Sequence, residues 1–156
     1  MANVGAVVNS IRNIMRQDRG ISGDAQRLEQ LGWMLFLKII NDKDEELEML
    51  KDDYQSVIPE KFQWRNWATD PEGITGEALR SFVNSELFPA IRGMVIPPKS
   101  SDVIIYRLRR RLLMIRQSFT DMNNYMTNGT AMRELINYLH ANIEYDNSGQ
   151  RDAFGD

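Results

Sequence analysis

Five arginines lie within ten residues of one predicted helix, and they form the strongest candidate binding group in this sequence. They are found in YRLRRRLLMIR, residues 106–116, at Arg107, Arg109, Arg110, Arg111 and Arg116. Guanidinium groups neutralise phosphates and release the counterions that surround them, so such a cluster could bind a nucleic-acid duplex. From Lys99 to Arg116, six basic residues are accompanied by one acidic residue, Asp102.

The positions of these arginines around the helix also allow a second interpretation. The predicted helix has an apolar stripe formed by Ile104, Leu108, Leu112, Ile115 and Phe119. At about 100° per residue, the arginines flank this stripe on both sides, and only Arg110 points directly away from it. Flanking arginines commonly lay their stems along a core and pair with acidic groups. Two hypotheses therefore stay open: contact with DNA or a partner protein, and pairing inside the domain.

Carboxylates are concentrated in a different segment of the chain. Between residues 42 and 53 there are seven acidic residues and two lysines, although the net charge of the whole chain is only −3. Their spacing is not that of a calcium-binding loop, so we interpret them as the solvated face of a helix. They are also candidate internal partners for the arginines.

The residue combinations that catalysis requires are missing from the sequence. His140 is the only histidine and there is no cysteine, so the sequence holds no pair of these residues at metal-ligand spacing. We expect His140 to be a surface or half-buried residue. No G-x-S-x-G elbow is present, and the closest glycine pairs do not follow a strand as a nucleotide-binding loop requires. We therefore expect no catalytic residue, no metal site and no cofactor in this chain.

A central helix that could position these groups is indicated by QLGWMLFLKIINDKDEE, residues 30–46. Its apolar run, Leu31–Ile40, has half the roughly 20 residues that a membrane-spanning helix needs, and it contains Lys38. The apolar residues cover nearly the whole circumference, which excludes a coiled-coil seam. A helix that is apolar on all sides is buried on all sides, so we predict a central core helix over about residues 24–54, capped by Ser22 or Asp24.

Helical periodicity extends over most of the remaining chain. We expect a first helix ending near Gly20, a third capped by Thr75 and bent or restarted at Pro89, a fourth capped by Ser100 or Ser101, and a last one after NNYMTNGT. In addition to the stripe given above, the predicted inward-facing residues are Val4, Val7, Val8, Ile11, Ile14, Met15, Leu47, Leu50, Leu79, Phe82, Val83, Leu87, Met132, Leu135, Ile136, Leu139 and Ile143.

Residues 55–74 form the least regular segment and contain the large aromatics Phe62, Trp64 and Trp67. We expect these side chains to pack onto the core, with a platform for stacked bases as the alternative. No alternating strand pattern is present. We therefore predict an all-α fold, a compact bundle of about five to six helices around the central helix, as one domain over residues 1–145.

The order of several motifs resembles a known family. IMRQDRG at the end of the first helix is followed by GDAQR, QLGWMLFLKIIND, FQWRNWA, NGTAMRELINYL and GQRDAFGD, and together they span essentially the whole chain. In this order and spacing they are similar to the N-terminal domain of the modification (methyltransferase) subunit of type I restriction-modification systems.

This resemblance implies a linker beginning at residues 146–156 and, beyond it, a domain that binds S-adenosylmethionine and methylates adenine at N6. The family's Asn-Pro-Pro-Phe/Tyr motif is not found in this chain, whose one Pro-Pro pair follows Ile96. The implied partners are double-stranded DNA, the specificity subunit, a second modification subunit and the restriction subunit, without a membrane. The expected role is to clamp DNA and contact subunits; the alternative is a helical protein-interaction module without DNA contact. We expect a cytoplasmic location, which the absence of cysteine fits.

Overall fold

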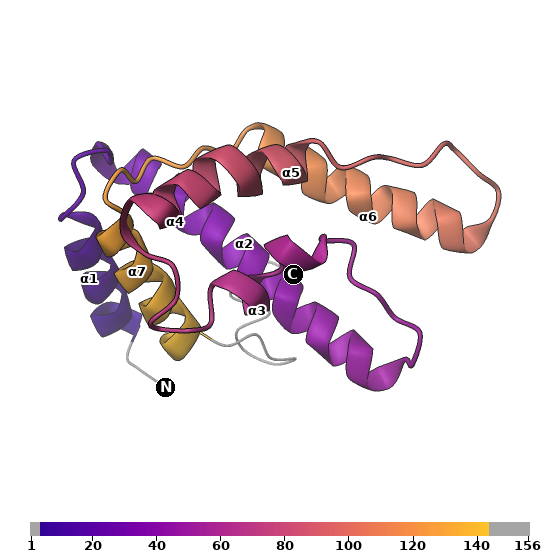
Figure 1. Cartoon of the computed structure of the whole chain (residues 1–156), viewed down its shortest axis with the longest axis horizontal. Helices are drawn as coiled ribbons and strands as arrows, with labels where there is room; N and C mark the ends of the chain where they lie inside the picture. The colour runs from indigo at the N-terminus through magenta and orange to yellow at the C-terminus, as the bar shows by residue number, and fades with distance from the viewer. Residues whose placement is uncertain (1–3, 144–156) are drawn as a thin grey trace.

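The computed structural model describes residues 4–143, and all regular structure in this range is helical (Figure 1). The elements in chain order are α1 (Val4–Met15), α2 (Gly23–Leu50), the 3-10 turn η1 (Glu60–Phe62), α3 (Trp64–Trp67), α4 (Gly76–Phe82), the π-helical turn η2 (Val83–Leu87), α5 (Phe88–Arg92), α6 (Val103–Thr120) and α7 (Gly129–Asn142). The prediction of an all-α fold is confirmed. The predicted linker at residues 146–156 lies outside the described residues.

Helix α2 is the central element of the core. Trp33 and Met34 are completely buried, and every residue from Leu31 to Ile40 is buried or half-buried. In Figure 1, α2 runs diagonally through the molecule, with α1 and α7 beside its N-terminal half. The predicted burial of the apolar run is confirmed. Among the described residues, no helix is long and apolar enough to cross a membrane.

A chain of aromatic contacts joins α2 to α5 and α6. Trp33 meets Phe88 edge to face with ring centroids 5.1 Å apart, and Phe88 meets Phe119 in the same way at 5.2 Å. Phe119 also lies 5.8 Å from Phe36 on α2. Edge-to-face pairs of this kind add about 0.5–1.5 kcal/mol beyond the burial of their area. The C-terminal half of α6 is therefore fixed to the core.

The end of α2 differs from the prediction in two ways. The helix ends at Leu50, four residues before the predicted end, and Lys51 adopts an extended conformation. Leu50, expected to face inward, is 72% exposed, and Met49 is 87% exposed. The reason is that the chain turns back after Asp53, so that the following segment covers α2 around Asp44, before its last turns.

Helices α4 and α5 form one nearly continuous helical run that is interrupted by the π-helical turn η2. Pro89 is the second residue of α5, just after this turn. Proline has no backbone N–H to donate to the preceding turn, so a locally widened helix accommodates it. The predicted break at Pro89 thus takes the form of a π-helical turn. The inward-facing residues Leu79, Phe82, Val83 and Leu87 are all buried as predicted.

The aromatic segment, residues 55–74, packs onto the core, as predicted. Trp64 and Trp67 are buried, with ring centroids 5.3 Å apart. Arg133 of α7, itself buried, donates to the carbonyl oxygens of Trp67, Ala68 and Ile74. The two indole rings are consequently not available as a platform for bases.

The residues predicted to face inward are buried throughout α7 but only in part of α1. On α7, Met132, Leu135, Ile136 and Leu139 are buried, and Ile143 is half-buried just after the helix. On α1, Ile11, Ile14 and Met15 are buried and Val7 packs against the core, but Val4 and Val8 are exposed. On α1 the apolar periodicity therefore continues farther toward the N-terminus than the packing does.

Candidate functional site

The arginine cluster lies on α6, whose N-terminus is capped by Asp102. The Asp102 carboxylate accepts hydrogen bonds from the backbone N–H of Ile104 at 2.9 Å and of Ile105 at 3.2 Å. The prediction of Ser100 or Ser101 as the cap is wrong, although the Ser100 hydroxyl accepts a hydrogen bond from the N–H of Asp102. A carboxylate at this position satisfies two free donors and also opposes the helix dipole.

Three of the five arginines are half-buried and hydrogen-bonded within the domain. Arg111 donates to Asp44 Oδ1 at 2.8 Å, Arg109 to the carbonyl oxygen of Pro97 at 3.1 Å, and Arg116 to that of Met94 at 3.3 Å. These contacts hold α6 against α2 and against the segment that precedes α6. For these three side chains the observed contacts agree with the internal-pairing hypothesis.

Asp44, the partner of Arg111, is almost completely buried at 1% exposure. Its Oδ1 also accepts a hydrogen bond from the Tyr54 hydroxyl at 2.6 Å, and its Oδ2 accepts one from the Ser56 hydroxyl. Burial and the hydrogen bond to Asp44 raise the pKa of Tyr54 to about 12. The interpretation of residues 42–53 as a solvated face is therefore wrong at Asp44, because the chain folds back over this residue. The sequence indicated these acids as partners for the arginines, but it gave no sign of the Tyr54 and Ser56 hydroxyl donors, which only tertiary folding brings to Asp44.

The other two arginines, Arg107 and Arg110, are exposed. No ion pair within residues 4–143 involves Arg107, and the Arg110 guanidinium lies 5.8 Å from the centre of the Tyr106 ring. At about 100° per residue, Ile104, Arg107 and Arg110 fall within an arc of about 120°, so they share one face of α6. Two cations and an apolar side chain are thus presented together to solvent.

The apolar stripe of α6 is buried along only half of its length. Leu112, Ile115 and Phe119 are in the core, whereas Ile104 is 78% and Leu108 40% exposed. The expectation that both face inward is wrong, because α6 continues beyond the body of the domain, as Figure 1 shows. All residues from Ser101 to Leu108 are exposed. Helical periodicity identified the stripe, but it does not report where the neighbouring elements end.

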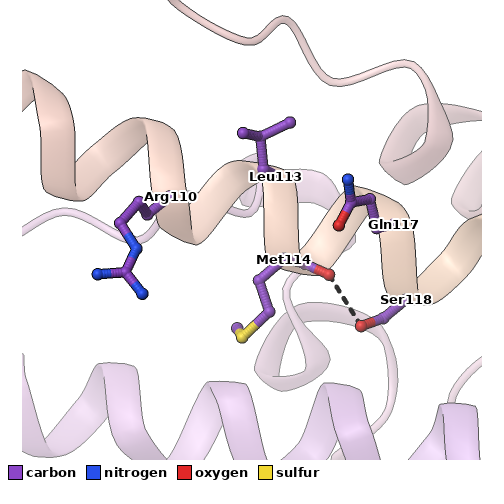
Figure 2. Close-up of a pocket in the computed structure, with 5 residues that line it drawn as sticks. All are labelled: Arg110, Leu113, Met114, Gln117 and Ser118. Atoms are coloured by element: carbon purple, nitrogen blue, oxygen red, sulfur yellow. Dashed lines mark hydrogen bonds between the residues drawn. The ribbon is translucent and has the colours of Figure 1, made fainter. Parts of the chain in front are cut away.

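A shallow hollow lies along the solvent-facing side of α6 (Figure 2). Its lining residues all belong to this helix: Arg110, Leu113, Met114, Gln117 and Ser118. Arg110 and Met114 point to one side of the helix, and the Ser118 hydroxyl donates to the Met114 carbonyl oxygen at 2.8 Å. Because one helix supplies the whole lining, the hollow has no opposing wall that could enclose a small molecule. We therefore interpret it as part of a contact surface rather than as a ligand pocket.

His140 lies away from the arginines and helps to hold the aromatic segment. It is exposed, as the sequence suggested, while its Nδ1 accepts a hydrogen bond from the Trp64 indole N–H at 3.3 Å. Desolvation and the nearby Lys38 ammonium lower the pKa of His140 below 6.5. Among the described residues, no group of three or more His, Cys, Asp and Glu side chains could hold a metal ion.

Comparison with known proteins identifies the family. The family model of the HsdM N-terminal domain matches residues 4–139. The chain is 45% identical over 154 residues to the Escherichia coli type I restriction enzyme EcoEI methylase subunit. The aligned region covers 99% of this chain and 30% of that protein.

A solved structure agrees with this match. The crystal structure of a protein described as the modification subunit of a type I restriction enzyme, from Vibrio vulnificus, superposes with a TM-score of 0.80 at 30% identity. The match covers 96% of this chain and 32% of the Vibrio chain, so the chain spans about a third of the length of these relatives. By its sequence and by its fold, the chain belongs to the HsdM N-terminal domain family of type I modification subunits.

Proposed function

We propose that this domain holds double-stranded DNA and neighbouring subunits for a type I modification enzyme, and that it takes no part in methyl transfer itself. The observation that carries this proposal is the exposure of Arg107 and Arg110 on the half of α6 that extends beyond the domain. Two guanidinium groups on one exposed helical face can contact phosphates without disturbing the core. Arg109, Arg111 and Arg116 position this helix through their hydrogen bonds within the domain.

The catalytic chemistry belongs, in this proposal, to a following part of the parent protein. Residues 1–145 form the helical domain, and residues 146–156 begin a linker to a methyltransferase domain that uses S-adenosylmethionine to methylate adenine at N6. This is supported by the names of the relatives, a methylase subunit and a modification subunit, and by their roughly threefold greater length. A protein of this kind acts in the cytoplasm, together with a specificity subunit, a second modification subunit and a restriction subunit.

A DNA-holding domain has a clear physical role in such an enzyme. Methylation of a base requires that the base leave the helical stack, which costs a few kcal/mol. A domain that grips the backbone can hold the duplex during this step and release it afterwards. Backbone contacts of this kind fix position without reading sequence, which leaves recognition of the target to another subunit.

A second candidate function is a protein-interaction module without DNA contact. The observation that favours it is the exposure of several large apolar side chains on the same half of α6: Val103, Ile104, Ile105, Tyr106 and Leu108. Contiguous apolar surface of this kind is typical of protein interfaces. The two candidates differ in their dependence on salt, since phosphate contacts release counterions and apolar contacts do not.

Binding of a fluorescent DNA duplex, measured by anisotropy over a range of salt concentrations, tests the proposal. Replacing Arg107 and Arg110 with alanine should weaken binding and lower the slope of log K against log salt by about 2, because each lost phosphate contact contributes about 0.9. The matched control replaces Arg12 and Arg19, which are exposed at the α1 end, and should leave the slope nearly unchanged. An unchanged slope for Arg107 and Arg110 would favour the interaction module, and an equal effect of both pairs would show that DNA is not held specifically by α6.

A further inference from the structure

The single histidine of the chain joins α7 to the aromatic segment. His140 lies in the last turn of α7, and its Nδ1 accepts a hydrogen bond from the Trp64 indole N–H at 3.3 Å. Trp64 is 1% exposed, so the indole is shielded from water, and His140 is the one acceptor of its N–H among the described residues. The histidine itself is exposed. A proton from solvent can therefore reach the group on which this buried donor depends.

Only a neutral imidazole can accept the hydrogen bond from Trp64. In the neutral ring one nitrogen donates and the other accepts, whereas both nitrogens of the protonated ring are donors. After protonation, the N–H at Nδ1 of His140 and the indole N–H of Trp64 would face each other as two donors. A buried N–H that has lost its acceptor destabilises the arrangement that buries it. Protonation of His140 thus acts against the observed packing of Trp64.

The charged groups around His140 are of both signs, and the cations among them are buried. Lys38 of α2 and Arg133 of α7 are 3% and 5% exposed, and both oppose a proton on the imidazole. Asp42 and Glu45 of α2 favour the proton, but Asp42 is already paired with Lys38 at 2.9 Å. Desolvation, followed by the Lys38 ammonium, lowers the pKa of His140 below 6.5. The surroundings therefore favour the neutral ring that Trp64 requires.

The part of the chain that carries Trp64 also supports α6. Gln63 donates from Nε2 to the carbonyl oxygen of Ile58 at 2.9 Å, and the Ile58 N–H donates to the Ser56 hydroxyl oxygen at 3.1 Å. The Ser56 hydroxyl donates in turn to Asp44, the buried carboxylate that binds α6. The stretch from Ser56 to Trp64 is thus connected by hydrogen bonds to α7 at one end and to the contact between α2 and α6 at the other.

We propose that the His140–Trp64 contact is a proton-operated latch, in which protonation of His140 releases the Trp64 indole and loosens residues 56–64 from α7. The pH dependence has a defined sign. Because the pKa of His140 is lowered while the latch is closed, the closed state is fully favoured above about pH 6.5 and loses stability as the pH falls from there toward the closed-state value. The inference goes beyond the proposed function and does not depend on DNA binding.

Hydrogen exchange followed by NMR tests the latch. Since His140 is the only histidine, its titration is observed alone in a chain without a histidine tag. The exchange rates of the Trp64 indole N–H and the Ile58 amide are compared with those in His140→Asn at each pH. The asparagine oxygen can accept the same hydrogen bond but cannot be protonated. The ratio of the wild-type rate to the variant rate should rise severalfold between about pH 7.5 and about pH 5.

A second variant, Trp64→Phe, removes the donor and keeps an aromatic ring. The midpoint of the imidazole C–H signal of His140 should then lie at higher pH than in the wild type, because the neutral ring has lost its partner. The Trp33 indole, which is completely buried on α2 and does not bind His140, is the internal reference, and its exchange ratio should not change with pH.

Two outcomes would overturn the latch. One is an exchange ratio for Trp64 that stays constant over the pH range, and the other is an imidazole midpoint that is the same in the wild type and in Trp64→Phe. Glu144, four residues after His140, lies outside the described residues. The rise of the ratio should persist in Glu144→Gln, and its loss there would assign the pH dependence to Glu144 and also overturn the inference.

Discussion

Arg111 and Asp44 are 67 residues apart in the chain and join α6 to α2 through a hydrogen bond of 2.8 Å. Asp44 is buried, and Arg111 is its one cationic partner among the described residues. The Arg111 guanidinium also lies 5.6 Å from the centre of the Tyr54 ring. This contact lies at the point where the two helices leave the body of the domain, and it holds in place the half of α6 that carries Arg107 and Arg110.

Replacing Arg111 with methionine should lower the free energy of unfolding by about 2 kcal/mol. The buried Asp44 carboxylate would keep the hydroxyl donors Tyr54 and Ser56 but lose its compensating charge. Urea denaturation measures the change. The matched control is Arg110→Met at the preceding position of the same helix, which is exposed and should change stability by less than about 0.5 kcal/mol. Equal losses for the two variants would show that the Arg111–Asp44 contact adds no stability.

Replacing Gly129 with alanine should prevent normal packing of α7 against α4. A Cβ atom at Gly129 would lie 1.8 Å from the carbonyl oxygen of Gly76, a backbone atom that cannot move aside without shifting α4. We expect a loss of more than about 3 kcal/mol or an unfolded chain. The control is Gly32→Ala in the middle of α2, where a Cβ meets nothing within 4 Å. Because alanine favours the helix, this control should gain about 0.5–1 kcal/mol in thermal or urea unfolding.

Replacing Asp18 with asparagine should destabilise the domain at neutral pH by about 2 kcal/mol. The buried Asp18 carboxylate accepts hydrogen bonds from the backbone N–H of Gly20, Thr127 and Asn128, and thereby ties the α1–α2 turn to the loop before α7. Burial raises the pKa of Asp18, but these hydrogen bonds outweigh burial and hold the pKa below 3.8.

The pH dependence of this effect has a defined sign. Because the pKa of Asp18 is lower in the folded chain, its stabilisation is complete above about pH 3.8 and is lost as the pH falls through the folded-state value. The stability difference between wild type and Asp18→Asn, measured in urea, should therefore be constant from neutral pH to about pH 5 and should shrink below about pH 3.8. A difference that persists unchanged into acid would mean that the ionised carboxylate is not responsible.

The parts of the fold that follow from local patterns were predictable from the sequence. The buried apolar run of α2 and the inward faces of α4 and α7 depend on helical periodicity, and their burial is confirmed. The packing of Trp64 and Trp67 was predictable because large aromatics contribute so much apolar area.

The wrong predictions concern side chains whose burial or hydrogen bonds depend on tertiary structure. Ile104 continues a correct stripe, yet it is exposed because the body of the domain ends before it. Asp44 reads as one of several surface acids, yet the return of the chain through Tyr54 buries it. The sequence predicts a serine as the cap of α6, but the neighbouring Asp102 accepts the capping hydrogen bonds. The arginine cluster of the candidate site was predictable from the sequence. Which arginines are hydrogen-bonded within the domain and which are exposed depends on neighbouring segments that only the fold brings close.

The most direct test of the central claim is hydrogen–deuterium exchange of this chain with and without a DNA duplex, at a chain concentration where it is monomeric. The account predicts slower exchange for the backbone amides of residues 103–111, the N-terminal half of α6, and no change in α1 or α7. Protection centred on α1 or α7, with residues 103–111 unaffected under conditions where DNA is bound, would contradict it.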